Sequence, residues 1–305
     1  MLKIFSCMNR YRKNFRFLTY KKYLLLLILL SFWNFSQSQT LEVGAIVGGS
    51  NYQGDITSSE FAVLKQQINF GIGGFLRYNF NEQLSLKLQI LSTELEGEDA
   101  LSSNEILRQR NLRFSSPLLD ASLRVEWHFL ETIFGSESII SPYVSVGGSF
   151  FTFNPQAVYE GTLHDLQELS TEGQGLEAYP DRERYELYNF SVLGGIGIAF
   201  KVSDDFQIAI DFTGHRTFTD YLDDVSTTYV DYFDLLDAKG LTAANIAYQS
   251  DDFFDVSQTS PPPGSVRGNP NFNDYYFIGG ITLSYNLINP YRTSGRRGQI
   301  GCPTF

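Results

Sequence analysis

The sequence predicts an all-β fold, an eight-stranded antiparallel transmembrane β-barrel of the outer-membrane kind, with short periplasmic turns and long extracellular loops. Three observations predict it: an N-terminal export signal, side chains that alternate between apolar and polar, and connections that alternate between short and long. The composition agrees, since 26 Gly, 26 Phe and 18 Tyr beside only 2 Met are typical of twisted sheet with aromatic belts. A mean hydropathy of -0.15 does not describe a helical membrane protein, and two cysteines in 305 residues exclude a small disulfide scaffold.

Residues 1–38 have the features of a signal peptide. They contain seven basic residues and no acidic one, and their apolar run at 23–30 is well short of the roughly 20 residues of a spanning helix. Ser36 and Ser38 occupy the two small positions of a signal cleavage site, so the mature chain is expected to begin near Gln39. The mature chain is acidic, with 16 basic residues against 34 acidic ones.

Strict alternation recurs through the mature chain. Within 206–213, one face of the predicted strand is apolar and the other carries the smaller and polar residues Gln207, Ala209, Asp211 and Thr213. The same pattern fills 84–90, 119–129 and 275–287. A secreted soluble barrel or sandwich would also alternate in this way, so the lengths of the connections decide between the two classes.

Eight candidate strands follow from the alternation. They lie at roughly 41–52, 67–80, 84–94, 114–129, 140–154, 187–202, 206–216 and 274–288. The connections after the second, fourth and sixth strands are short and the others are long, ending with the loop 217–273. An even strand number with both termini on the short-turn side is typical of outer-membrane barrels, and places the barrel at 39–288 in the cell outer membrane, in contact with its lipids.

Inward-facing positions of such a barrel are expected to form a packed polar plug. Eight strands enclose only enough space for side chains, so charges inside must be paired with one another. The predicted plug residues are Arg77, Lys87, Asp120, Arg124, Glu126 and Asp211. In this interpretation the three basic side chains meet the three acidic ones, and the role of all six is structural.

The loop 217–273 contains many large apolar residues. An amphipathic stretch at 228–247 is spaced as one or two helical turns would use it, and the run 261–263 is three prolines. A disordered surface loop would not need these apolar groups, so the loop is expected to pack on itself or on a partner. Four residues at its start are the candidate partner contacts: Asp220, Tyr221, Asp223 and Asp224.

Catalytic and metal sites find little support in the sequence. The three loop aspartates could offer oxygens to calcium, but their spacing does not match an EF-hand loop. A Ser-His-Asp set could be assembled from His215, Asp220 and Ser226, or use His128 or His164, yet no spacing demands it. We therefore expect no enzyme, no cofactor, no metal and no nucleic-acid partner.

The chain ends in a predicted periplasmic tail, residues 289–305. The tail carries Arg292, Arg296 and Arg297, which could face an acidic partner. It also carries Cys302, the one cysteine that remains after signal cleavage. In an oxidising compartment a lone thiol favours an interchain disulfide, and an incidental free thiol is the alternative.

Several motifs together resemble the PorG-like outer-membrane proteins of Bacteroidetes. They are the segments TDYLDDVS at 219–226, RGN at 267–269, DYYF at 274–277 and GCPT at 301–304, beside the signal peptide and the eight-strand pattern. The likeness covers essentially the mature chain and is most specific in its last third.

The resemblance implies a non-enzymatic component of the type IX protein secretion and gliding-motility machinery. Its implied partners are a PorK-like lipoprotein and a PorN-like ring protein, with the long loops a candidate contact for the secretion translocon. The barrel would anchor the periplasmic ring to the outer membrane, and Cys302 would form a disulfide with the lipoprotein. Two alternatives stay open at this point: a small lipid-modifying outer-membrane enzyme and a general OmpA-like structural barrel.

Overall fold

The fold was analysed in a computed structural model that describes residues 39–56, 67–129, 139–249 and 261–288. The predicted signal peptide at 1–38 and the predicted tail at 289–305 lie outside these residues. The arginines of the tail and Cys302 therefore have no structural account, and their proposed contacts remain predictions.

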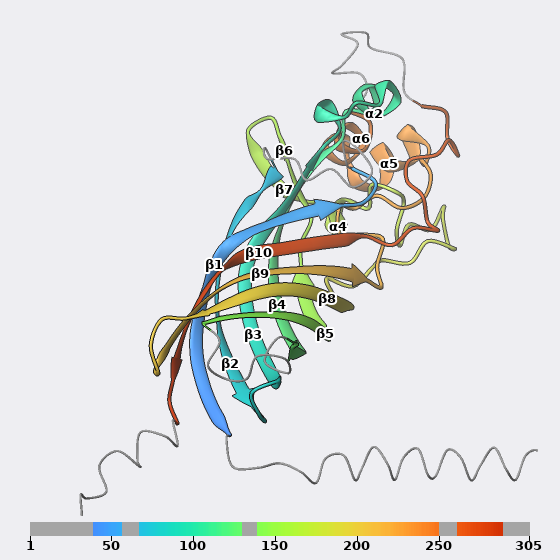
Figure 1. The fold of residues 1–305 in the computed structure, drawn as a ribbon. Coiled ribbons are helices and arrows are strands. Elements are labelled where there is room, and N and C mark those ends of the chain that lie inside the picture. The colour runs from blue at the N-terminus through green and yellow to red at the C-terminus, as the bar shows by residue number, and fades with distance from the viewer. Residues whose placement is uncertain (1–38, 57–66, 130–138, 250–260, 289–305) are drawn as a thin grey trace, which may run out of the picture. The chain divides into compact units, whose positions relative to one another are not determined.

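Eight long strands form one closed antiparallel barrel, which confirms the predicted fold class (Figure 1). They are β1 (Thr40–Gln53), β2 (Asn69–Asn79), β3 (Leu84–Glu98), β4 (Arg113–His128), β5 (Ile140–Phe153), β8 (Tyr188–Lys201), β9 (Phe206–Thr217) and β10 (Tyr275–Asn286). Each strand pairs with the next along the chain, and β10 returns to pair with β1. The result is an up-and-down barrel in which every described long strand has two neighbours.

The short turns have local sequence causes. Between β2 and β3, the side-chain oxygen of Asn81 accepts hydrogen bonds from the backbone of Gln83 and Leu84, at 2.9 and 2.7 Å. Between β8 and β9, Ser203 Oγ plays the same part for Asp205 and Phe206. Asn and Ser favour such turns because their short side chains reach the backbone two or three residues ahead.

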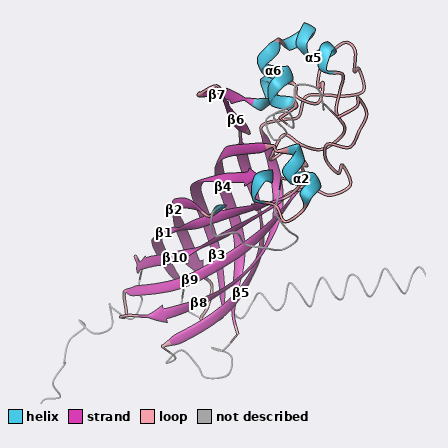
Figure 2. Cartoon of the chain, turned by 90° about the horizontal axis from the view of Figure 1, so that it is seen from above, coloured by secondary structure: helices cyan, strands magenta, loops and turns pink. Residues whose placement is uncertain are grey.

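Shorter elements gather beyond the other end of the barrel (Figures 1 and 2). They are η2 (Asp99–Leu101), α2 (Glu105–Arg110), the hairpin β6 (Gln156–Tyr159) and β7 (Thr162–Asp165), α4 (Leu166–Leu169), α5 (Tyr232–Lys239) and α6 (Leu241–Ala247). The helical turns expected within 228–247 are confirmed by α5 and α6. Asp231 caps the start of α5, and Gly240, with φ of 88°, separates the two helices.

The outer wall of the barrel is an apolar belt. Its exposed side chains are mostly Val, Leu, Ile and Phe, such as Ile72, Ile90, Leu123, Ile196 and Ile281. Rings pair on the wall toward both ends, for example Phe206 with Tyr285 and Phe150 with Phe190. Such a surface is stable against hydrocarbon and unstable against water, so it places the barrel wall in a bilayer.

One close approach explains a glycine pair in the wall. Gly48 of β1 lies opposite Gly280 of β10, and a Cβ at Gly48 would stand 2.0 Å from the carbonyl oxygen of Gly279. The strands can come this close because neither position carries a side chain.

Candidate functional site

The lumen holds a buried charge network near the short-turn end. Arg77 Nε lies 2.8 Å from Glu126 Oε2, and its Nη1 lies 3.0 Å from Glu42 Oε2. Lys87 Nζ lies 3.1 Å from Asp211 Oδ2, which the Arg124 guanidinium also contacts.

These six side chains, three cations and three carboxylates, are the lumen network: Glu42, Arg77, Lys87, Arg124, Glu126 and Asp211. They come from five different strands, and all are buried. Buried ions are tolerated only when each has an opposite charge, so the network fills the lumen with a neutral polar plug.

The network differs from the sequence expectation in one member. Asp120 lies in the lumen, but Glu42 takes its place as the third carboxylate. Asp120 precedes Arg124 by four residues on the same strand, which separates the two by roughly 13 Å along the barrel. Asp120 instead accepts a hydrogen bond from the Tyr276 hydroxyl at 2.7 Å.

A second polar group surrounds His215 toward the long-loop end. The ring stacks on Tyr276, with 4.3 Å between ring centroids. Its Nδ1 lies 3.2 Å from Ser191 Oγ, and its Nε2 lies 3.1 Å from Thr213 Oγ1. His215 is thus fixed between hydroxyl groups inside the barrel.

The geometry around His215 does not match a Ser-His-Asp triad. A triad needs the acid on one ring nitrogen and the serine on the other. Here Asp120 Oδ2, at 3.8 Å, and Ser191 approach the same nitrogen, Nδ1. Asp220 and Ser226, from which such a set could have been assembled, are not among the described groups around the ring nitrogens, which are Ser149, Ser191, Thr213 and Asp120. His128 is also inward and buried, with its Nδ1 2.8 Å from Ser141 Oγ.

The long loops fold over the barrel mouth into a structure that we call the cap, made of the described residues in 54–56, 99–112, 154–187, 218–249 and 261–274. Its apolar residues Leu222, Val225 and Ile246 join one hydrophobic cluster with the barrel residues Tyr276 and Phe151. The mouth is therefore closed by packed side chains, which favours the expectation that the long loop packs on itself.

Glu172 is a hub of hydrogen bonds within the cap. Its carboxylate accepts from the backbone N–H groups of Ser226 and Thr227, each at 3.0 Å, and from the Thr227 hydroxyl at 2.7 Å. Arg267 Nη1 completes the set at 3.1 Å and also donates to the carbonyl of Asp224 at 2.6 Å. One buried carboxylate thus joins three segments of the cap that are far apart in the sequence.

Asp223 and Asp274 share one phenol. The Tyr52 hydroxyl oxygen lies 2.6 Å from Asp223 Oδ2 and 3.0 Å from Asp274 Oδ1. A hydroxyl has a single hydrogen and can donate to only one of these oxygens, so the other contact is a hydrogen bond only when its carboxyl is protonated. The geometry therefore favours a neutral carboxylic acid at one of these two positions.

Burial and neighbouring carboxylates shift the pKa values of the cap in the same direction. Burial, with the charge of Asp55 adding to it, raises the pKa of Asp223 to about 8. Burial also raises the pKa of Asp220 to about 8 and that of Asp224 to about 6. The pKa of Asp274 rises as well, through burial and through the charge of Asp223. Arg110 and Arg267 are the cations that face these groups and lower the values.

A pH dependence of the cap follows from these shifts. A carboxyl whose pKa is raised in the closed cap stabilises it below the ordinary pKa near 4, and this stabilisation is lost as the pH rises toward 8. We expect the cap to open more at pH 8 than at pH 5. The equilibrium constant for opening should rise by up to about tenfold per pH unit for each carboxyl that is protonated only in the closed cap. Hydrogen exchange of 218–249 measures this after correction for the intrinsic rate.

The double variant Asp223→Asn with Asp274→Asn is the control for the pH dependence. Its amides cannot lose a proton in this range, so the part of the pH dependence that comes from Asp223 and Asp274 should vanish, while the part that comes from Asp220 and Asp224 stays and the barrel is unaffected. Equal opening of the native cap at pH 5 and pH 8 would contradict a protonated carboxyl at Asp223 or Asp274.

The four candidate contacts at the start of the long loop lie inside the cap. Asp220, Asp223 and Asp224 are only 8%, 1% and 0% exposed. Asp224, with φ of 65°, accepts from the Tyr185 hydroxyl at 2.7 Å, and Tyr221 stacks on Tyr185 at 4.6 Å. The carboxyl groups of Asp223 and Asp224 are hydrogen-bonded within the cap, whereas both carboxyl oxygens of Asp220 are buried without a hydrogen-bond partner among the described residues. The closed cap thus buries all three aspartates, and the partner contacts expected at these positions stay a prediction.

Sequence reasoning did not single out Glu172, Tyr185 or Arg110. Arg110 pairs with Asp99 at 2.7 Å and also donates to the backbone of Asp55 at 2.8 Å. Glu172 and Tyr185 stand in loops and Arg110 ends the short helix α2, and the composition of these polar segments gives no periodic signal. Arg267 could be noticed in the sequence because it belongs to the RGN motif at 267–269. Glycine is needed at 268 because a Cβ there would lie 2.7 Å from the backbone nitrogen of Ser226.

Two further features concern only the described residues. No group of three His, Cys, Asp or Glu side chains among them is arranged to hold a metal ion. The helices within these residues are all too short or too polar to cross a membrane.

The structure is a closed barrel with an apolar outer wall, a lumen network in which three cations balance three carboxylates, and a packed cap. The chain is therefore an outer-membrane β-barrel protein. Residues 21–259 match the model of a family described as a domain of unknown function, DUF6089. The chain belongs to this family. No curated protein matches it.

Several solved outer-membrane proteins are similar to the chain in outline. Ail of Yersinia pestis, in complex with the heparin analogue sucrose octasulfate, has 9% identity and a TM-score of 0.38, over 82% of this chain and 100% of Ail. Neisserial surface protein A has 7% identity and a TM-score of 0.38, with coverage of 82% and 100%. Outer membrane protein W of E. coli has 10% identity and a TM-score of 0.35, with coverage of 83% and 100%. These TM-scores are too low to carry an argument. The assignment of the chain to the outer-membrane barrels therefore depends on its own strand pairing and on its apolar outer wall.

Proposed function

We propose that the protein is a non-enzymatic component of the type IX secretion and gliding-motility machinery that anchors a periplasmic ring to the outer membrane. The ring would be built by a PorK-like lipoprotein and a PorN-like protein. The proposal starts from the resemblance of the segments at 219–226, 267–269, 274–277 and 301–304 to PorG-like proteins. The outer-membrane barrel fold of this chain is compatible with it.

The observation that carries the anchoring role is the closure of the barrel at two levels. The lumen network fills the interior with ion pairs such as Arg77 with Glu126, and the cap packs Leu222 and Val225 into the mouth. A passage for a secreted protein is incompatible with this packing. A rigid membrane anchor that leaves transport to other components is compatible with it.

The role of the tail is tested by deletion in the living cell. We expect removal of 291–305 to leave the barrel in the outer membrane while ring assembly and secretion are lost. The variant Cys302→Ser separates the disulfide from the rest of the tail. On non-reducing electrophoresis of native membranes, the wild type should form a reductant-sensitive larger species that this variant lacks.

Intact ring assembly and secretion after the deletion would remove the tail from the proposed mechanism. A wild-type protein that migrates as a monomer with and without reductant would reject the disulfide alone.

A general OmpA-like structural barrel is the second candidate, and the same closed lumen favours it. The two functions differ in their partners, because a structural barrel needs no stable complex with a ring. Purification in mild detergent through a tag in an extracellular loop separates them. Recovery of a lipoprotein and a ring protein supports the anchor, and recovery of the barrel alone supports the structural role. A lipid-modifying enzyme has less support, because His215 and His128 are enclosed in the lumen.

A further inference from the structure

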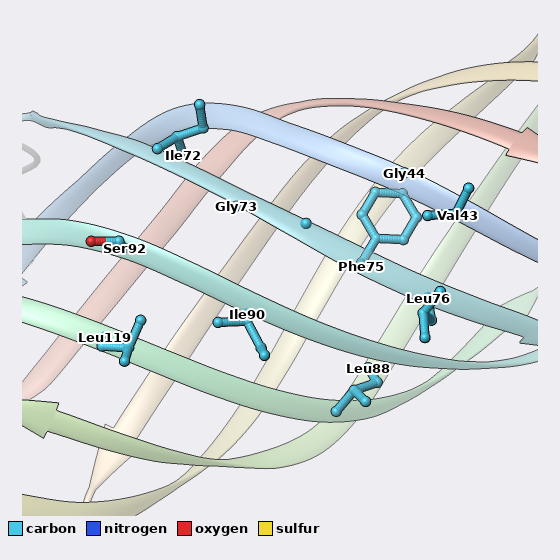
Figure 3. Close-up of a pocket in the computed structure, with 11 residues that line it drawn as sticks. Val43, Gly44, Ile72, Gly73, Phe75, Leu76, Leu88, Ile90, Ser92 and Leu119 are labelled. Carbon is cyan, nitrogen blue, oxygen red and sulfur yellow. The ribbon is translucent and has the colours of Figure 1, made fainter.

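A groove lies on the outer wall of the barrel, in the apolar belt. It crosses β1, β2, β3 and β4 and is lined by Val43, Ile72, Gly74, Leu76, Leu88 and Ile90, among others (Figure 3). In the strand pairing, Leu76 lies opposite Leu88, Gly74 opposite Ile90 and Ile72 opposite Ser92. These positions span four residues along β2, or roughly 13 Å.

The floor of the groove is an outward-facing glycine that no side chain covers. A Cβ at Gly74 would find only one atom within 4 Å, the carbonyl oxygen of Gly44 at 3.6 Å. The lack of a side chain at this position therefore leaves a depression between the large apolar residues on either side.

Two other outward glycines of the wall, Gly214 and Gly279, are covered by the protein itself. A Cβ at Gly214 would stand 3.1 Å from the ring of Phe277, and one at Gly279 would stand 3.3 Å from the ring of Phe212. The two rings stack at 5.9 Å and fill the space above these glycines. Gly194 of β8 is as open as Gly74, so the groove around Gly74, and not the missing side chain alone, distinguishes this side of the barrel.

The groove is continuous with the lipid-facing wall, and this limits what can fill it. Its lining is hydrocarbon except for Ser92, which stands at the end nearer the long loops. Above Ser92 the outward positions of β3 become acidic, with Glu94, Glu96 and Glu98. An occupant must therefore be apolar along the groove and polar at its upper end.

We propose that the groove beside Gly74 binds one acyl chain of an outer-membrane lipid, with the polar head of that lipid at the Ser92 end. An ordered acyl chain in the groove makes closer contact with Ile72, Leu76 and Ile90 than mobile lipid does. The additional dispersion contacts stabilise the bound chain. The occupant is a lipid and not a protein side chain, because lipid is what the belt meets on every side.

Photo-crosslinking in vesicles tests the proposal. The full-length mature protein is placed in phosphatidylethanolamine vesicles that contain a trace of phosphatidylethanolamine with a diazirine in its acyl chain. After irradiation, mass spectrometry maps the crosslinks. We expect them to be several-fold more frequent at Leu76, Leu88 and Ile90 than at Ile196 and Ile281, although the latter two side chains are the more exposed.

Two matched variants decide the outcome. Gly74→Leu fills the groove and should reduce crosslinking there to the level of the rest of the wall. Gly194→Leu adds the same side chain on the outer face of β8, where a Cβ would meet nothing within 4 Å, and should leave crosslinking at the groove unchanged. Heat-modifiable migration in gels confirms that both variants fold.

The proposal is overturned if crosslinks are uniform around the wall or persist at the groove in Gly74→Leu. Crosslinks that are rarer in the groove than on the rest of the wall would mean that lipid is excluded from the groove, and would equally overturn the lipid site.

Discussion

Replacing Arg77 with methionine is expected to destabilise the barrel by about 3–5 kcal/mol, the usual cost of leaving a buried charge without its partner. Methionine retains most of the packing of the arginine stem but leaves Glu126 and Glu42 without their shortest ion pairs, at 2.8 and 3.0 Å. The lumen network would then hold three carboxylates and two cations. Urea unfolding in detergent micelles, followed by tryptophan fluorescence, measures the loss.

Two variants give this prediction its controls. Arg113→Met changes an exposed arginine that donates to the carbonyl of Val158, and should alter stability by less than about 0.5 kcal/mol. The double variant Arg77→Met with Glu126→Gln removes charge of both signs and should recover part of the loss. An unfolding midpoint for Arg77→Met equal to that of the wild type would mean that the network contributes nothing to stability.

The barrel could be predicted from the sequence because the bilayer imposes a simple rule on it. Every second residue faces hydrocarbon, so Phe206, Ile208, Ile210 and Phe212 appear as a pattern that needs no knowledge of the partner strands. The predicted end of one strand came too early, at a point where the strand leaves the hydrocarbon and its residues no longer follow this rule. β3 was expected to end at 94 but continues to Glu98, because its outward residues beyond the belt are acidic while its pairing with β4 persists.

The lumen was predictable in part for the same reason. Inward positions of paired strands are known from the alternation, so Arg77, Lys87 and Asp211 could be assigned to the interior. Their exact partners depend on the height of each residue along the barrel, which register alone determines. Asp120 was predicted to pair with the cations because it faces the lumen. It does face the lumen, but it lies at a different height along the barrel from the cations.

The contacts of the cap could not be predicted, although two of its helices were, because these contacts join distant segments through single hydrogen bonds. Glu172 and Thr227 are 55 residues apart, and Tyr52 and Asp274 are 222 apart. Nothing periodic marks such residues. Polar loop residues such as Asp223 are ordinarily exposed, and they are buried here because donors from other loops satisfy them. The motifs of 219–226 and 267–269 therefore mark the interior of the cap.

Replacing Glu172 with alanine is expected to open the cap while the barrel remains folded. The change leaves the backbone N–H groups of Ser226 and Thr227 without their acceptor and Arg267 without its nearest carboxylate, at a cost of about 3–5 kcal/mol. Hydrogen exchange of the cap segment 218–249 should then accelerate by about a hundredfold or more. Exchange in the strands should change little, since their hydrogen bonds do not involve the cap.

Glu177→Ala, an exposed position in the same loop, should have no such effect. Glu172→Gln, which keeps an acceptor oxygen but loses the charge, should fall between the two. If Glu172→Ala instead unfolded the strands together with the loops, cap and barrel would form one cooperative unit and the hub would support the whole protein.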